Sequence, residues 1–249
     1  MVKIRIIESK PALILEEDEK HLVISDLHLG FENTVTSNKI FLGKNSSIKQ
    51  ITDSIKNLIQ SENVDSLILL GDVKSSIQTI FKSEWNDIPY FFDEMKKNVS
   101  VTLVPGNHDA NIQKLIPSEI SITSSNGIII DDVLLTHGHV MPSKNFSNVR
   151  SIIMGHIHPV FFQENSLVNG QRVWISLKTK KQFLFPSTIG EIEITVLPSY
   201  NPYFYASTKK LYKKSISPII QKIKNKSIAK IITLDGTIIG NEAELEYLV

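Results

Sequence analysis

Cysteine is absent from the 249 residues of this chain. The absence excludes disulfide bonds, thiolate metal sites and a cysteine nucleophile. Any metal ion must therefore be held by His, Asp, Asn or Glu side chains, a donor set that suits manganese, iron, zinc or magnesium. The length is sufficient for a substantial core without covalent cross-links.

Long apolar runs are also missing. No stretch approaches the roughly 20 residues of a membrane span, and the start of the chain, MVKIRIIESK, lacks the apolar region and cleavage site of a signal peptide. We therefore expect a cytoplasmic protein with no membrane partner. No internal repeat, linker or dimerisation seam is evident, so residues 1–249 are expected to form one domain, and the oligomeric state stays open.

A strong overall charge is lacking too, but the net charge of +1 is unevenly distributed. Residues 1–164 carry a net charge of −5, residues 165–230 carry +10 and residues 231–249 carry −4. The asymmetry favours a polyanionic partner, although a solvated lysine-rich face would give the same numbers.

Lysine and aromatic residues are mixed in this basic portion, most densely in a lysine-rich segment at about 200–230. Cations for the phosphates and rings for the bases are what single-stranded nucleic-acid binding requires. Aromatic residues that fill a core beneath solvated lysines are the alternative. The residues concerned are Lys178, Lys180, Lys181, Lys209, Lys210, Lys213, Lys214, Lys222, Lys224 and Lys226, with Tyr200, Tyr203, Phe204, Tyr205 and Tyr212.

Short apolar runs recur along the chain, and polar side chains able to bind metal follow each of them. Their length and their content of β-branched residues indicate buried strands. The pairs are HLVIS before Asp26-Leu27-His28, SLILL before Gly71-Asp72, VTLVP before Gly106-Asn107-His108-Asp109, VLLT before His137-Gly138-His139, and SIIM before Gly155-His156-Ile157-His158.

Helical patterns alternate with these strands in the first part of the chain. Apolar residues at helical spacing predict helices over 46–61 and 83–97, with Ser46 or Ser47 and Ser83 as their starting residues. After residue 155 the pattern predicts strands at FFQEN, RVWISL and EIEITVL, and a final hairpin that turns at Asp235-Gly236. The segment 207–226 is predicted to be partly helical and broken at Pro218.

The carboxyl ends of strands in a layered sheet gather ligands, so all five polar clusters can meet at one edge. Six of the seven histidines of the chain fall in these clusters. Each cluster alone has an ordinary structural explanation, such as a turn or a hydrogen-bonded buried histidine. The ordered set of five predicts a metal site.

The order D-x-H, G-D, G-N-H-D, H-G-H and G-H-x-H resembles the calcineurin-like metallophosphoesterase superfamily. The resemblance implies an α/β fold, specifically a four-layer α/β/β/α sandwich with mixed sheets, and a hydrolase of phosphate esters with a binuclear metal centre. DLHLGFE (26–32), Lys74 of GDVK and the ending LDGTIIG resemble an ICC-like branch related to the nuclease subunit of double-strand-break repair complexes. That branch implies a nucleic-acid substrate, DNA or RNA, and a helicase or repair-complex partner.

The resemblance also implies a role for each conserved-type side chain in the motifs. One divalent ion would take Asp26, His28, Asp72 and His158, and the other would take Asp72, Asn107, His137 and His156, with Asp72 bridging both. Manganese is the first expectation for the two ions, with iron, zinc or magnesium as alternatives. The catalytic acid would be His108, which would protonate the leaving alkoxide.

Three further residues have less certain roles. Asp109 is interpreted as a catalytic-site carboxylate that orients His108. Lys74 is interpreted as a substrate-phosphate contact, with an ordinary surface lysine as the alternative. His139 either contacts substrate phosphate or hydrogen-bonds a metal ligand. Many superfamily members carry a second Asp or Asn soon after the G-D motif, and this chain has Val73, Lys74, Ser75 and Ser76 there instead.

Fold and metals do not select the substrate. The first hypothesis is a metal-dependent phosphodiesterase or nuclease. The second is a small-molecule phosphatase, nucleotidase or pyrophosphatase. The third is a scaffold with a silent site, which ranks last because all seven ligand positions and His108 are present.

Overall fold

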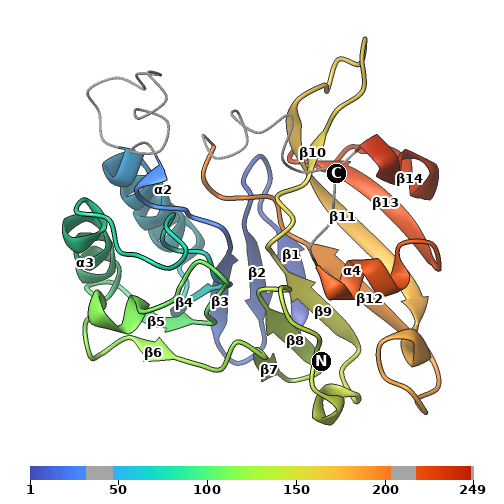
Figure 1. Cartoon of the computed structure of the whole chain (residues 1–249), viewed down its shortest axis with the longest axis horizontal. Coiled ribbons are helices and arrows are strands. Elements are labelled where there is room, and N and C mark those ends of the chain that lie inside the picture. The colour runs from blue at the N-terminus through green and yellow to red at the C-terminus, as the bar shows by residue number, and fades with distance from the viewer. Residues whose placement is uncertain (32–46, 203–216, 248–249) are drawn as a thin grey trace.

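Two β-sheets packed face to face form the centre of the molecule (Figure 1). The computed structural model describes residues 1–31, 47–202 and 217–247. The six strands of the first sheet neighbour one another in chain order: β1 (Lys3–Ile6), β2 (Leu13–Glu16), β3 (Lys20–Ile24), β4 (Ser66–Leu69), β5 (Ser100–Leu103) and β6 (Ser121–Ile122).

The second sheet has eight strands. In spatial order they are β14 (Ile238–Asn241), β13 (Ser227–Thr233), β11 (Gln171–Lys180), β12 (Glu191–Val196), β9 (Ser151–Met154), β8 (Val133–Thr136) and β7 (Ile128–Ile130), and β10 (Val160–Phe161) pairs with β11. Both sheets are mixed. β3 to β6 are parallel in the first sheet, and β8, β9 and β12 are parallel in the second.

Helices cover the outer faces of the two sheets (Figure 1). The first sheet is covered by α2 (Ser47–Glu62) and α3 (Glu84–Met95), and the second by the short α4 (Pro218–Ile223). Four 3₁₀ turns complete the described elements: η1 (Ile112–Lys114), η2 (Lys144–Phe146), η3 (Lys181–Phe183) and η4 (Glu242–Tyr247). The layers follow the order helix, sheet, sheet, helix, which confirms the predicted α/β/β/α sandwich.

The central strands are buried on both faces because each face meets a different layer. Leu67 and Leu69 of β4 pack in the cluster that contains α2 and α3, whereas Ile68 and the following Leu70 pack between the two sheets. Successive side chains of a strand point to opposite faces, so a continuous apolar run fills two cores at once. The five apolar runs preceding the polar clusters all form strands as predicted.

The helix predictions are confirmed with small shifts at their ends. The predicted helix 46–61 is α2, and the predicted helix 83–97 is α3, which begins at Glu84. Ser83 makes no side-chain cap hydrogen bond. The final hairpin forms between β13 and β14, and Gly236 in its turn has a φ of +90°.

Two predictions about the second half were wrong. Pro218 does not break a helix but begins α4, because proline fits the first turn, where its missing N–H has no partner to lose. Ser217 caps this helix by accepting a hydrogen bond from the backbone N–H of Ile220. FFQEN does not form a full strand, since β10 ends at Phe161 and a turn follows. The rest of the segment 207–226, up to residue 216, lies outside the described residues.

Within the described parts of the chain, no helix is long and apolar enough to cross a membrane.

The half-buried Glu94 joins the two helices of the outer layer. Its carboxylate binds Lys56 of α2 at 2.6 Å and Lys97 beyond the end of α3. Hydrogen bonds from these lysines lower the pKa of Glu94 from 4.5 to about 2. Because the folded-state pKa lies below the ordinary value, the interaction stabilises the fold above pH 4.5 and is lost as the pH falls toward 2.

We expect Glu94→Gln to lower the urea midpoint of unfolding at pH 7. The difference from the unmodified chain should shrink as the pH falls from 4.5 toward 2, which urea unfolding at a series of pH values would measure. Glu8→Gln is the matched control, since Glu8 is exposed and has no ion-pair partner among the described residues. A Glu94→Gln difference that does not change with pH would contradict the role of this carboxylate.

Candidate metal centre

The five polar clusters meet at one edge of the sandwich, where the strands that precede them end. β3, β4 and β5 of the first sheet and β8 and β9 of the second bring their carboxyl ends to this edge. The two sheets are linked directly there, because the backbone N–H of His156 donates to the carboxylate of Asp26 at 3.1 Å. Ligand-capable side chains from segments 130 residues apart therefore lie side by side.

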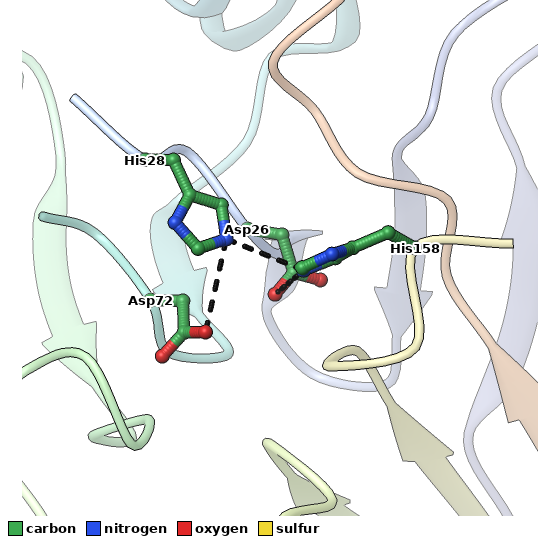
Figure 2. A group of neighbouring side chains, drawn as sticks. All are labelled: Asp26, His28, Asp72 and His158. Carbon is green, nitrogen blue, oxygen red and sulfur yellow. Dashed lines mark hydrogen bonds and ion pairs between the residues drawn. The ribbon is translucent and has the colours of Figure 1, made fainter. Parts of the chain in front are cut away.

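The first group contains Asp26, His28, Asp72 and His158, whose ligand atoms all lie within 4.8 Å of one another (Figure 2). Nε2 of His158 is 2.9 Å from Oδ1 of Asp26, and Nε2 of His28 is 3.7 Å from Oδ2 of Asp72. The two imidazole Nε2 atoms of this group are 3.3 Å apart. These are the four residues predicted to surround one ion.

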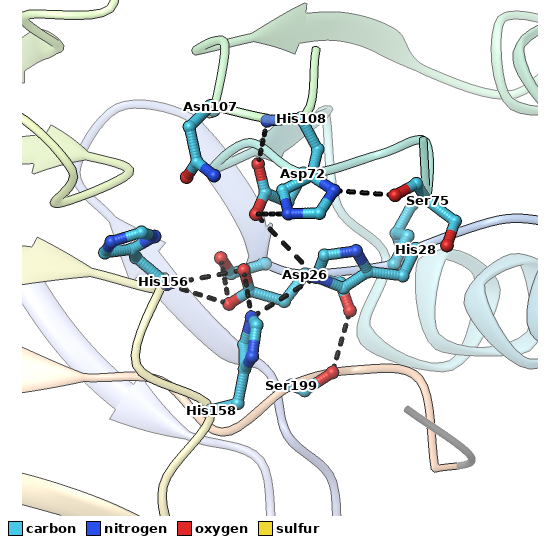
Figure 3. Close-up of polar contacts among 12 residues, drawn as sticks. Asp26, His28, Asp72, Ser75, Asn107, His108, His156, His158 and Ser199 are labelled. Atoms are coloured by element: carbon cyan, nitrogen blue, oxygen red, sulfur yellow. Dashed lines mark hydrogen bonds and ion pairs between the residues drawn. The ribbon is translucent and has the colours of Figure 1, made fainter. Parts of the chain in front are cut away.

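The second group contains Asp72, His137 and His156 and meets the same 4.8 Å limit. Nε2 of His137 is 3.3 Å from Oδ2 of Asp72. The amide oxygen of Asn107 is 3.2 Å from the same Nε2, which places Asn107 beside this group (Figure 3). Asp72 belongs to both groups, as the sequence predicts for a bridging carboxylate.

The donor set fits divalent cations. Two buried carboxylates face several imidazole nitrogens, and these are the ligands that manganese, iron or zinc accept. Two Nε2 atoms at 3.3 Å cannot both present lone pairs without a cation or proton between them. Nδ1 of His156 is buried and has no hydrogen-bond partner among the described residues. A bound cation would satisfy these groups.

The backbone at the centre is strained. Five residues of the two groups have a positive φ: Asp26 (60°), His28 (40°), Asp72 (52°), His156 (73°) and His158 (49°). A left-handed conformation costs a residue other than glycine about 1–2 kcal/mol. Strain of this kind persists where surrounding structure imposes it, and it concentrates at functional sites. Here it turns consecutive polar side chains toward one point.

The charges of the centre are strongly coupled. Burial alone would raise the pKa of Asp26, but the imidazoles of His158 and His137 lower it to about 2. The pKa of Asp72 is likewise lowered, because His137, His28 and His108 outweigh its burial. Against the lowering effect of burial, Asp72 and Asp26 raise the pKa of His137 to about 9. Both carboxylates are therefore anionic and ready to hold a cation at neutral pH.

His108 lies at the rim of the two groups without belonging to either. Its Nδ1 donates a hydrogen bond of 2.6 Å to the backbone carbonyl of Ser75 (Figure 3). Its Nε2 is 3.9 Å from Oδ2 of Asp72, and its ring packs edge-on against that of His28 at 4.9 Å. The Nε2 atom consequently faces the metal groups, which is the position required of a proton donor.

The prediction that Asp109 orients His108 is not supported by the contacts. The buried carboxylate of Asp109 accepts backbone N–H groups instead, from Gly106 and Asp72 at 2.8 Å each and from Val73 at 2.9 Å. Burial, with the nearby charge of Asp72, raises the pKa of Asp109 to about 6. Asp109 ties the loop after β5 to the loop after β4, so it positions the loop that carries Asp72.

The prediction that Lys74 contacts substrate phosphate was wrong. Lys74 has an exposed fraction of 0%. Its ammonium donates to the carbonyl and hydroxyl oxygens of Ser76 and to the carbonyl of Ile77. The four-carbon stem folds inward because these acceptors lie within its own loop, which the residue type alone does not reveal.

His139 lies beside the second group, with its ring 5.2 Å from that of His137 and 6.0 Å from that of His156. Its Nδ1 is buried without a hydrogen-bond partner among the described residues. Burial and the adjacent His137 lower the pKa of His139 to about 4, so its ring is neutral at pH 7. A contact with substrate stays a prediction.

One set of positioning residues has no sequence signal. Ser199 donates its hydroxyl to the carbonyl of Asp26 at 2.8 Å, and the side-chain amide of Asn201 donates to the carbonyl of Leu27 at 2.9 Å (Figure 3). Arg172 holds this segment in turn through the carbonyls of Ser199 and Tyr200. The contacts fix the strained loop that carries Asp26 and His28, and all of them go to backbone oxygens.

The basic portion divides into two parts relative to the centre. β12 runs parallel to β9, and β11 and β13 are antiparallel to β12 and β11, so Lys178, Lys180 and Lys226 lie at the end of the sheet opposite to the metal groups. Tyr200 is buried in the first core. Residues 203–216, which hold the other predicted aromatics and four of the lysines, lie outside the described residues.

A family model described as calcineurin-like phosphoesterase matches residues 20–156. The chain belongs to the calcineurin-like phosphoesterase family. Its members hydrolyse phosphate esters with the help of divalent metals, and this chain is accordingly a hydrolase of ester bonds. No curated protein matches this calcineurin-like phosphoesterase in sequence.

Solved structures share its fold. The nuclease MPE of Pseudomonas putida is similar over 94% of this chain and 98% of its own, with 16% identity and a TM-score of 0.54. The E. coli phosphoesterase Yfce has 18% identity over 89% of this chain and 97% of its own, with a TM-score of 0.41. An archaeal phosphodiesterase has 16% identity over 73% and 85%, with a TM-score of 0.38.

Gly71 tests whether the close approach of loops maintains the centre. It has a φ of +76°, and a Cβ there would lie 2.6 Å from the backbone nitrogen of Gly106 and 2.6 Å from Nδ1 of His137. Gly190 has a φ of +101° with nothing within 4 Å, so it provides the same backbone strain without a clash.

We expect Gly190→Ala to lower the free energy of unfolding by about 1 kcal/mol. Gly71→Ala should cost about 1–3 kcal/mol more and should also reduce the number of Mn²⁺ ions bound per chain. Urea unfolding and metal analysis after dialysis measure the two effects. Equal effects of the two substitutions would show that loop contact at Gly71 is unimportant.

Proposed function

We propose that this calcineurin-like phosphoesterase is a phosphodiesterase with two divalent ions, manganese first, and that its substrate is nucleic acid. The observation that carries the proposal is the position of Asp72, which is shared by two groups of ligand atoms and faced by the non-ligand imidazole of His108. Two ions around a shared carboxylate suit displacement at phosphorus.

The residues divide into holders and a proton donor. Asp26, His28, Asp72 and His158 would hold one ion, and Asp72, Asn107, His137 and His156 the other. Ions held there supply Lewis-acid activation of the phosphate ester and of a water molecule. His108 would donate a proton from Nε2 to the leaving oxygen, while its Nδ1 stays hydrogen-bonded to the Ser75 carbonyl.

The support for nucleic acid comes from the residues that flank 203–216. Asn201 contacts the loop of Asp26 and His28, and Ser217 donates to the carbonyl of Gly138 at 2.9 Å, beside His137. Both flanks of the lysine-rich stretch are therefore attached to metal-bearing loops. We extend the proposal to a cytoplasmic protein that works with a helicase or repair complex, as the ICC-like resemblance implies.

With Mn²⁺ we expect faster hydrolysis of bis-p-nitrophenyl phosphate than of p-nitrophenyl phosphate. A shared carboxylate and two ions leave one ester oxygen of a diester outside the ligand shells. Measuring kcat/KM for both substrates decides the class. A preference for the monoester would transfer the proposal to small phosphate esters or nucleotides, and turnover of neither substrate with two ions bound would favour a silent scaffold.

His108→Ala should act according to the leaving group. A p-nitrophenolate leaves without protonation, whereas the alkoxide of a dinucleotide needs the proton. We therefore expect a loss of about 10²- to 10⁴-fold for the dinucleotide TpT and a much smaller loss for the p-nitrophenyl ester of thymidine 5′-phosphate. Equal losses on the two substrates would remove the proton-donor role.

Binding of single-stranded oligonucleotides should weaken steeply with salt, because phosphate contacts release counterions. Replacing Lys209, Lys210, Lys213 and Lys214 by Gln should flatten the plot of log K against log salt concentration by about 0.7 for each lysine that contacts phosphate. The control replaces Lys178, Lys180, Lys224 and Lys226 by Gln, an equal loss of charge away from the metal groups. Unchanged slopes in both variants would exclude the lysine-rich stretch as the binding surface.

A further inference from the structure

A buried carboxylate holds the loop between β4 and α3. Glu84, the first residue of α3, has an exposed fraction of 0%. Its Oε1 accepts the backbone N–H groups of Ser75 at 3.1 Å and Ser76 at 2.8 Å. Its Oε2 accepts the hydroxyl of Ser76 at 2.5 Å and the backbone N–H of Phe81 at 2.8 Å. One side chain thus binds the loop at both of its ends.

The buried ammonium of Lys74 acts on the same loop from the opposite charge. It donates to the carbonyl oxygens of Ser76 and Ile77, so the loop lies between an anion that takes its N–H groups and a cation that takes its carbonyl groups. A buried charge without such partners would cost several kcal/mol. The pair therefore has one low-energy arrangement, and the loop conformation is fixed with it.

Ser75 connects this loop to the catalytic imidazole. Its N–H lies between the carbonyl of Leu29 at 3.0 Å and Oε1 of Glu84 at 3.1 Å. Its carbonyl is the acceptor for Nδ1 of His108 at 2.6 Å. The peptide groups on either side of Ser75 are therefore held by Glu84, and the direction of the acceptor carbonyl depends on them.

We infer that Glu84 is a positioning residue for His108, which it aims at the leaving group through the carbonyl of Ser75. The inference rests on the proposed role of His108 as proton donor. Glu84 touches neither metal ligand nor substrate in this scheme, and its effect is transmitted by one loop, supported by Lys74.

A carboxylate is specifically required at this position. Both of its oxygens accept hydrogen bonds from N–H or O–H donors of the loop. Glutamine keeps the shape but presents one NH₂ group, which would face these donors and cannot accept from them. Glu84→Gln should consequently displace the loop with little change in volume.

The experiment compares Glu84→Gln with the unmodified chain on two matched diesters, TpT and the p-nitrophenyl ester of thymidine 5′-phosphate. Only the first requires a proton for its leaving group. We expect kcat for TpT to fall about 10- to 100-fold, as for a reacting group displaced by about 1 Å, and kcat for the aryl ester to fall less than threefold. Asp93→Asn, an exposed residue of the same helix, is the control and should leave both rates unchanged.

A selective fall on TpT supports the positioning role. An equal fall on both diesters, or no fall on either, overturns it, because general damage to the fold or to the metal groups does not depend on the leaving group. Metal content and the circular dichroism spectrum, measured on the same samples, separate such damage from the selective effect.

Failure of the proposed function would be recognised separately. If the unmodified chain cleaves only monoesters, the same comparison is made with p-nitrophenyl phosphate and glycerol phosphate, and the ratio again decides the role of Glu84. If Glu84→Gln does not fold, Ser76→Ala removes one of the four hydrogen bonds to Glu84 and replaces it in the test. A smaller but still selective fall would support the inference, and an unselective or absent one would overturn it.

Discussion

The electrostatic problem posed by two buried carboxylates governs the rest of this structure. Asp26 and Asp72 have exposed fractions of 0% and 1%, and they face imidazoles from four other strand ends. Burying an anion is costly unless opposite charge compensates it. The protonated His137 compensates in part, and its pKa of about 9 shows how strongly the carboxylates attract positive charge. A pair of divalent ions would complete the compensation, so the same groups that destabilise the empty centre give it affinity for metal.

The strained loops follow from this arrangement. Polar residues that come directly after a buried strand can meet at one point only if the chain turns sharply, and the left-handed φ of Asp26, His28 and Asp72 provides that turn. The backbone cost is offset by contacts that hold each loop in place. Asp109 binds the loop of Asp72, and Ser199 binds the loop of Asp26. Rigid loops of this kind keep ligand atoms in position before a metal arrives, which reduces the cost of ordering them on binding.

The ligand set was predictable from sequence because each ligand directly follows its own strand, and the strand is visible as an apolar run. The supporting contacts were not predictable. Lys74, Asp109 and Glu84 all bind backbone groups of loops, and a backbone carbonyl such as that of Ser75 leaves no trace in a residue type. Pro218 was misread for a related reason, since the meaning of proline depends on whether it falls inside a helix or at its first turn. The fold and the ligands could therefore be derived, but not what holds them.

The division of the basic portion bears on how the proposed substrate would be selected. Lysines at the far end of the second sheet cannot reach a phosphate at the metal groups, whereas ions bound to Asp26 and Asp72 would attract that phosphate without any lysine. Lysines near Asn201 and Ser217 would then act on the neighbouring phosphates of a polymer rather than on the one that is cleaved. In that arrangement the centre determines the chemical step, and the lysine-rich stretch determines only the preference for long substrates over short ones.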